Sequence, residues 1–443
     1  MLNYGTMKAD KIHYDPSGNA TAAEEATFLA DLAAHPPKHL FVISHGWNNN
    51  EAEADDLYRR FFIAADNVWA RFPGFTSSDC FALGIIWPSK KFDENAFAAA
   101  AGPNAVPGAA AIAPSAVDAA ITTQLTALKE IANDAAAQAF LDHAIAQIPL
   151  LSVSQSAQDD FVAALASAFP QGPQEPDPGL DSGLATLNTT PGHTVLNQIV
   201  ATLQTAPAAG RQTGGAAALG GAAGFNPLAA IKNAALVLAN VTTYWTMKER
   251  AGVIGRTGVV QTIAKVLAAL PAVKIHLIGH SFGGRLVTAA ANGLPGGSGG
   301  HQAATMLLLQ GAYSHYGMAQ NYQANTDGMF RSVITSHKVA SEIQITHSIH
   351  DIAVGLAYPI ASALAHQIGA AAWINPYGGM GADGARTTPE AFENTLEPVG
   401  AAYAPVIPPN IVRNLNGDAI IGGHGDVTHD EIAYAELTAV SRS

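Results

Sequence analysis

The stretch Lys274-Ile275-His276-Leu277-Ile278-Gly279-His280-Ser281-Phe282-Gly283-Gly284-Arg285 decides the fold. An apolar run ends at Gly279, and the apolar residues after Gly283 recur at helical spacing. The pattern therefore predicts a buried strand that turns sharply into a helix. In a Gly-x-Ser-x-Gly turn the serine hydroxyl is exposed at the end of the strand, and the small flanking residues let neighbouring backbones pass close to it. Ser281 is the candidate nucleophile.

Further apolar runs predict more buried strands. They cover residues 39–47, 79–87, 304–311 and 342–351, and a shorter one lies near 419–421. Continuous hydrophobicity indicates burial on both faces, as in a parallel sheet covered by helices. Helices are predicted at 22–34, 51–72, 228–251 and 258–270 and from about His429 onward, whereas residues 377–410 are rich in Gly and Pro and are expected to be irregular. This alternation predicts an α/β protein with a mostly parallel central sheet and helices on both faces.

Residues 92–226 differ in composition from the rest of the chain. They are dominated by alanine and contain helix-like segments at 116–148 and 158–168. We interpret them as a large helical insertion, acting as a cap or lid, within a core made of residues 1–91 and 227–443. The alternative is an independent helical domain with a task of its own.

A serine hydroxyl is a weak nucleophile at neutral pH and needs a base to take its proton. The chain has 16 histidines, so position must decide, and reactive groups gather at the carboxyl ends of the strands of such a sheet. His424 follows the last short strand in a glycine-flanked loop, before a helix whose start is marked by Thr428 and Glu431 as a capping box. His424 is therefore the predicted base. His429, in the first turn of that helix, is the alternative.

The base needs a carboxylate that orients it and stabilises its charged form. Asp351 stands at the end of the strand 342–351 and is followed by an apolar run. Asp327, in a turn sequence, is the second candidate. Asp426 is too close to His424 in sequence to be the obvious acid, and is expected to brace the loop through backbone N–H groups. Nucleophile, acid and base then follow one another in the order expected after a nucleophile turn.

Two backbone N–H groups are expected to bind the oxyanion that forms during attack on a carbonyl. One belongs to Phe282, at the start of a helix, where N–H groups and the positive end of the helix dipole coincide. The other is expected from the loop after His45-Gly46, most simply from Trp47. The predicted substrate pocket is formed by residues beside these groups, which are His45, Gly46, His280, Tyr313 and His315.

With these segments the chain resembles a serine hydrolase of the α/β-hydrolase superfamily, similar to lipases and esterases. The likeness rests on His45-Gly46-Trp47, Gly279-His280-Ser281-Phe282-Gly283, Asp351 and His424-Gly425-Asp426, and it covers roughly residues 39–90 and 228–437. In families that the chain resembles, the acid commonly follows the second strand after the nucleophile strand, which is the position of Asp351. The insertion is a departure, because many family caps come after the strand that follows the nucleophile.

The residues and the resemblance together predict hydrolysis of a carboxylic ester through a Ser-His-Asp triad and an acyl-enzyme intermediate. Esters are expected rather than amides, because the chain shows no charge dedicated to a peptide side chain, and an apolar acyl or alkyl substrate is expected because the chain is rich in apolar residues. The alternatives are a lipase or phospholipase acting at lipid interfaces, an amidase or peptidase on the same fold, and a hydrolase-fold binding protein without activity.

Composition narrows the classes of partner. The formal net charge of −13 and the lack of a Lys/Arg cluster argue against nucleic acid. No apolar stretch reaches the roughly 20 residues of a membrane span, so we expect no integral membrane association. No secretory signal stands at the N-terminus, so a cytoplasmic location is expected by default, with non-classical export left open. Cys80, in an apolar run, is expected to be a structural thiol. No metal and no cofactor is expected, the partner is a small-molecule ester, and the oligomeric state is left open.

Overall fold

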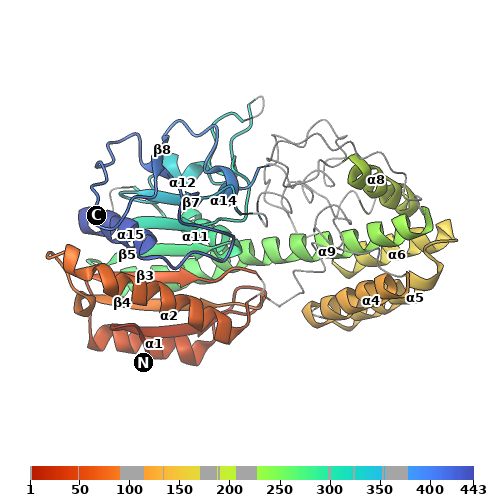
Figure 1. Cartoon of the computed structure of the whole chain (residues 1–443). Helices are drawn as coiled ribbons and strands as arrows, with labels where there is room; N and C mark the ends of the chain where they lie inside the picture. The colour runs from red at the N-terminus through yellow and green to blue at the C-terminus, as the bar shows by residue number, and fades with distance from the viewer. Residues whose placement is uncertain are drawn as a thin grey trace. The chain divides into compact units, whose positions relative to one another are not determined.

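The computed structural model describes residues 2–47, 49–89, 114–132, 134–169, 187, 190–205, 227–297, 301–322, 325–351, 354 and 378–443. The chain forms two compact units (Figure 1). The first comprises residues 1–91, 247–359 and 377–443, and the second comprises residues 92–246 and 360–376. One boundary lies within the long helix α9 (Pro227–Val253), so residues 227–246, which the sequence pattern assigns to the core, cluster with the second unit.

A nine-stranded sheet organises the first unit. Its strands are β1 (Leu2–Tyr4), β2 (Met7–His13), β3 (His39–Ser44), β4 (Cys80–Ile86), β5 (Lys274–His280), β6 (Thr305–Leu309), β7 (Ile343–His347), β8 (Ala391–Thr395) and β9 (Val412–Asn416). Their order is β1-β2-β4-β3-β5-β6-β7-β9-β8, and among these strands the β1–β2 pair alone is antiparallel. The predicted α/β protein with a mostly parallel sheet is confirmed.

The sequence pattern misses β1, β2, β8 and β9, which lie toward the two edges of the sheet. These strands carry polar residues, so they lack the apolar signal of a buried strand. In β9, Arg413 is buried and its charge is balanced by Glu342, whose Oε1 lies 2.5 Å from Arg413 Nε. The strand expected near 419–421 is wrong: this segment is a turn in which the Ile420 and Ile421 N–H groups donate to the Gly417 carbonyl oxygen. Its apolar residues are packed against the core without extending the sheet.

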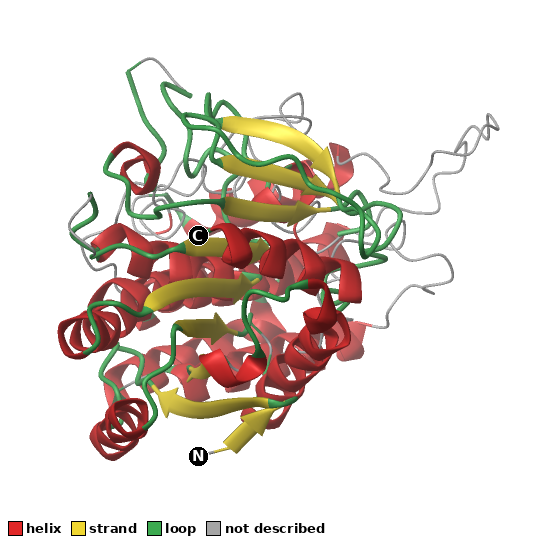
Figure 2. Cartoon of the chain, turned by 90° about the vertical axis from the view of Figure 1, so that its left-hand side faces the viewer, coloured by secondary structure: helices red, strands yellow, loops and turns green. Residues whose placement is uncertain are grey.

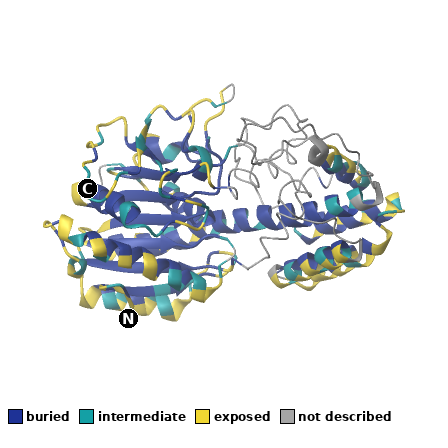
Figure 3. Ribbon diagram, in the orientation of Figure 1, coloured by how far each residue is buried: buried dark blue, intermediate teal, exposed yellow. Residues whose placement is uncertain are grey.

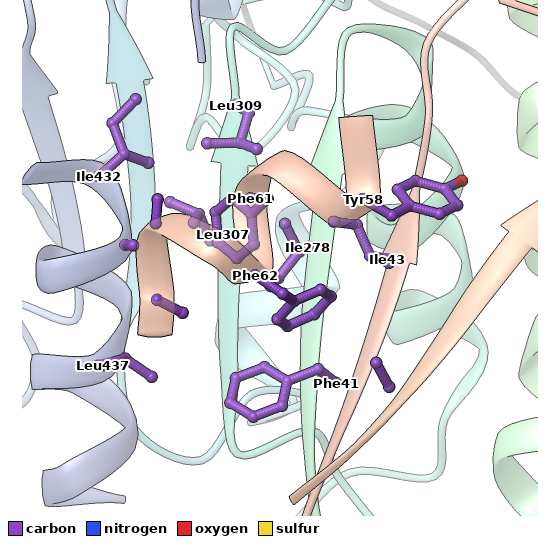
Figure 4. Packing of buried hydrophobic residues seen from close by; sticks show 14 of the residues in the cluster. Phe41, Ile43, Tyr58, Phe61, Phe62, Ile278, Leu307, Leu309, Ile432 and Leu437 are labelled. Atoms are coloured by element: carbon purple, nitrogen blue, oxygen red, sulfur yellow. The ribbon is translucent and has the colours of Figure 1, made fainter. Parts of the chain in front are cut away.

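Helices lie on both sides of the sheet (Figure 2). On one face, α2 (Glu51–Val68) packs against α15 (Asp430–Arg442). Their apolar side chains form a core cluster with alternate residues of the central strands, including Phe41, Ile43, Ile278, Leu307 and Leu309 (Figure 4). On the other face, α11 (Phe282–Gly293) packs on β3 and β5, and α10 (Val260–Ala269) and α1 (Ala22–Ala34) extend this layer. Burial on both faces explains why the central strands are mostly apolar.

Strand register brings the carboxyl ends of β3, β5, β6, β7 and β9 to one edge of the sheet. The pairs along this edge are Ser44 with Gly279, His280 with Leu309, Leu309 with Thr346, and His347 with Asn416. The segments that follow these five strands therefore begin beside one another.

A buried polar chain crosses the opposite, amino-terminal end of the strands. His39 Nδ1 lies 3.0 Å from His276 Nε2, His276 Nδ1 lies 2.8 Å from Thr305 Oγ1, and that hydroxyl donates to Glu436 Oε1 at 3.1 Å. Burial raises the pKa of Glu436 to about 8. Burial also lowers the pKa of His39 to about 4 and that of His276 well below its ordinary value. At neutral pH this network is therefore uncharged.

The second unit is helical in its described part. It contains α4 (Pro114–Ile131), α5 (Ala135–Gln147), η3 (Ile148–Leu150), α6 (Gln155–Ala168), α8 (Gly192–Thr205) and the first part of α9. The single segment expected over 116–148 is divided, because Asp134 caps a new helix by accepting the Ala137 N–H. Lys232 of α9 forms an ion pair with Asp118 of α4 at 2.6 Å. Helices α2 and α5 have buried and exposed residues at helical spacing, whereas most described residues of α9 and α11 are buried (Figure 3). No helix in the described part of the chain is both long and apolar enough to cross a membrane.

Candidate active site

Ser281 occupies the sharp turn between β5 and α11. Its backbone has φ 56° and ψ −122°. Residues other than glycine rarely adopt such a positive φ. A Cβ atom on Gly279 would lie 2.3 Å from the Gly283 carbonyl oxygen, and one on Gly283 would lie 2.3 Å from the Ser44 carbonyl oxygen. The close approach of β3, β5 and α11 therefore requires both glycines, which explains the Gly-x-Ser-x-Gly spacing.

The side chains of Ser281, His424 and Asp351 form one hydrogen-bonded chain. His424 Nε2 lies 2.8 Å from Ser281 Oγ, and His424 Nδ1 lies 2.9 Å from Asp351 Oδ2. Because a carboxylate only accepts hydrogen bonds, the imidazole proton is on Nδ1, and Nε2 is left to accept the serine hydroxyl. Asp351 is buried, whereas the His424 side chain is 25% exposed. This is the geometry that proton transfer from Ser281 to His424 requires.

Asp351 lies in the turn after β7, because β7 ends at His347 and does not continue to the aspartate as expected. Its N–H donates to the Ser348 carbonyl oxygen at 3.1 Å. The Val354 N–H donates to Asp351 Oδ1 at 2.9 Å, and Gln310 Nε2 donates to Oδ2 at 3.1 Å. Both carboxylate oxygens are thus held in place.

The loop between β9 and α15 carries His424. Within it, Asp426 Oδ2 accepts the Gly422 N–H at 2.9 Å, in line with the bracing role expected of this residue. From β5, His280 Nε2 lies 2.8 Å from the His424 carbonyl oxygen. A carbonyl accepts only, so His280 Nε2 carries the proton and donates it. Burial, with the nearby His424 as the next cause, lowers the pKa of His280 to about 3, so this donor is neutral.

His429 is the residue that precedes α15, and it does not lie in the first turn. The capping box expected from Thr428 and Glu431 is not formed, because the helix starts later and its N-cap has no side-chain hydrogen bond. His429 Nε2 instead lies 2.8 Å from Asp426 Oδ1. The structure therefore places His424, and not His429, within hydrogen-bonding distance of Ser281.

The loop after β3 passes directly beside Ser281. A Cβ atom on Gly46 would lie 2.5 Å from Ser281 Cβ and 3.1 Å from Ser281 Oγ. Trp47 follows Gly46, and its ring centroid lies 6.0 Å from that of Phe282, the first residue of α11. Both predicted oxyanion donors thus belong to residues next to the nucleophile, one of them at a helix N-terminus.

His45 lies beneath this loop and is 1% exposed. Its Nδ1 lies 2.8 Å from the Gly46 carbonyl oxygen, its Nε2 accepts the Trp87 N–H at 3.3 Å, and its ring stacks on that of Trp87. Burial lowers its pKa to about 4, so the imidazole is neutral at pH 7. His45 supports the backbone of the loop from inside.

The other predicted pocket residues are buried too. The Tyr313 hydroxyl lies 3.1 Å from Thr288 Oγ1, and His315 Nδ1 lies 2.9 Å from Asp383 Oδ2. Of the predicted pocket set, Gly46 and His280 contact residues of the Ser281 chain directly. A pocket role for Tyr313 and His315 stays a prediction.

The contacts of the remaining candidates, Asp327 and Cys80, fit structural roles. Asp327 Oδ1 accepts the Asn321 N–H at 2.8 Å within its turn. Cys80 is buried, and burial raises the pKa of its thiol to about 12, which disfavours a thiolate nucleophile. Among the residues that the structure describes, no group of three or more His, Cys, Asp or Glu side chains is arranged to hold a metal ion.

Gln310 is a site residue that the sequence analysis does not single out. It ends the apolar run 304–311 with a buried polar side chain, at the carboxyl end of the strand beside the nucleophile strand. That position was the available signal.

Comparison of the chain with models of known protein families, with curated proteins and with solved structures finds no match.

Proposed function

We propose that this chain is a serine hydrolase that cleaves carboxylic esters. The observation that carries the proposal is the hydrogen-bonded chain from Ser281 Oγ through His424 to Asp351, built from three separate strand ends. The strand, turn and helix around Ser281, with the Gly46 loop beside it, support a further proposal that the fold is of the α/β-hydrolase type.

The proposed reaction has two halves. Ser281 Oγ attacks the carbonyl carbon while His424 Nε2 takes the hydroxyl proton, and the Trp47 and Phe282 N–H groups bind the oxyanion. The tetrahedral intermediate then expels the alcohol, which receives the proton from His424, and an acyl ester is left on Ser281. Water attacks that ester, gives a proton to His424, and the carboxylic acid leaves as the Ser281 hydroxyl regains its proton.

Esters with apolar acyl or alkyl groups fit best. The residues beside the nucleophile, Gly46, Trp47 and Phe282, are uncharged and two of them are aromatic. Hydrolysis rates on matched esters and amides separate an esterase from an amidase or peptidase. A rise in activity when the substrate aggregates would identify a lipase or phospholipase. The cap role of residues 92–226 stays a prediction.

A fluorophosphonate probe tests the proposal, because it forms a covalent bond with an activated serine. We expect the probe to label the wild-type protein and the Ser78→Ala variant, which changes an exposed serine, but not Ser281→Ala. An unlabelled wild type would favour the binding protein without activity. Labelling of Ser281→Ala would place the nucleophile elsewhere.

A further inference from the structure

Gln310 directly follows β6 and is completely buried. Its backbone φ is 46°, in the left-handed region that glycine favours. A glutamine held there costs backbone energy, so its side-chain contacts must compensate.

The amide of Gln310 is fixed in one orientation by its partners. Thr346 Oγ1 donates to Gln310 Oε1 at 2.9 Å. On the other side, Nε2 donates to Asp351 Oδ2 at 3.1 Å and to the Gly381 carbonyl oxygen at 3.0 Å. Both of these partners only accept, so a rotated amide would place its oxygen against two acceptors.

Asp351 Oδ2 is the oxygen that also accepts the His424 Nδ1 proton. A hydrogen bond from Gln310 to this oxygen limits rotation of the carboxylate and so fixes the direction from which it meets the imidazole. A base held in the wrong orientation loses most of its effect, since a displacement of about 1 Å can cost roughly 100-fold in rate.

We propose that Gln310 is a positioning residue that aligns Asp351 with His424, and that the Thr346 hydroxyl sets the orientation of its amide. This inference rests on the proposed function. The Gln310 side chain hydrogen-bonds to Asp351, Thr346 and the Gly381 carbonyl oxygen, so its effect on His424 passes through Asp351.

Kinetics of Gln310→Met test the proposal, because methionine keeps the length of the side chain and removes its hydrogen bonds. We expect kcat on an activated ester to fall about 10- to 100-fold with KM within about twofold of the wild-type value. Thr346→Val should give a smaller loss of the same kind. Gln344→Met is the matched control. It also removes a buried glutamine amide from this sheet, one that donates to Glu342 and to the Ala435 carbonyl oxygen. The kcat of this variant should equal the wild-type value.

A double-mutant cycle separates positioning from general damage. In an Asp351→Asn background, Gln310→Met should change the residual rate by less than about twofold. An equal loss in both backgrounds, or a wild-type kcat in Gln310→Met, would overturn the proposal.

Proton NMR gives a readout that does not depend on activity. We expect a low-field resonance from the His424 Nδ1 proton that disappears in Asp351→Asn and moves upfield in Gln310→Met and, to a lesser extent, in Thr346→Val. If the wild type hydrolyses no ester but these shifts occur, the proposed function fails and the positioning role stands. If the enzyme is active and Gln310→Met leaves the resonance in place, the positioning role fails.

Discussion

A Cβ atom on Gly46 would lie 2.5 Å from the Cβ atom of Ser281, so the backbone of the loop after β3 packs directly against Ser281. Gly46→Ala should push this loop, and the Trp47 N–H with it, away from Ser281. Since the loss of one oxyanion donor typically costs 100- to 1,000-fold in kcat, we expect a loss of about that size in steady-state kinetics.

The control for Gly46 is Gly74→Ala, at a site where an added Cβ meets nothing within 4 Å. Its kcat should match the wild type. A fully active Gly46→Ala protein would mean that the loop does not take part in the reaction.

His424→Ala and His429→Ala distinguish the two candidate bases. Loss of His424 removes the acceptor of the Ser281 proton and should lower kcat by about four to six orders of magnitude. His429→Ala removes a contact with Asp426 at the start of α15 and should leave kcat within about twofold. Ester hydrolysis by both variants, measured with circular dichroism to verify folding, decides between them, and turnover retained by His424→Ala would exclude it as the base.

His280→Phe tests how the loop of His424 is held. Phenylalanine keeps a flat ring but loses the hydrogen bond to the His424 carbonyl oxygen. A neutral hydrogen bond contributes about 1 kcal/mol, so kcat should fall roughly five- to tenfold. Because burial holds the pKa of His280 near 3, this residue does not titrate in the assay range, and the acidic limb of the pH–rate profile should keep its midpoint. A shifted midpoint would contradict this expectation.

Glu436→Gln tests the buried network at the far end of the strands. The pKa of Glu436 is raised from its ordinary value of 4.5 to about 8, so the folded protein binds this proton more tightly than the unfolded chain does. Its stabilising contribution is complete below pH 4.5 and is lost as the pH rises through 8. The free energy of unfolding of Glu436→Gln, relative to wild type, should therefore rise between these limits, by about 3 kcal/mol at pH 7.

Urea denaturation at pH 4.5, 7 and 8 measures this difference. The buried neutral histidines His39 and His276 destabilise both proteins in acid, so their effect cancels in the comparison. Glu431→Gln, a partly exposed position on the same helix, controls for the change of residue type. A difference that stays constant with pH would contradict the prediction.

The centre of the fold can be predicted from sequence because β3, β4, β5 and β6 are mostly apolar and are buried along almost their whole length. The edge strands cannot be predicted in this way. β9 holds the buried Arg413, whose ion pair with Glu342 depends on a residue far away in the chain. Local patterns do not contain such a partner.

The candidate site also has a part that local sequence patterns predict and a part that they do not. Ser281 has a local signature, and the strand ends point to the regions of Asp351 and His424. The details come from tertiary contacts: Asp351 reaches the imidazole from a turn beyond β7, and Gln310 contacts Asp351 from the end of β6. Neither contact can be predicted from the spacing of residues in the sequence.

Ser281 and Gln310 directly follow two neighbouring strands, and both residues have a positive φ, of 56° and 46°. Each such residue costs of the order of 1–3 kcal/mol, and glycine at either position would relieve it. A substitution that makes the folded chain more stable here would remove either the hydroxyl or the amide. At this edge of the sheet, the residues that the proposed chemistry needs are therefore not the residues that the backbone conformation favours.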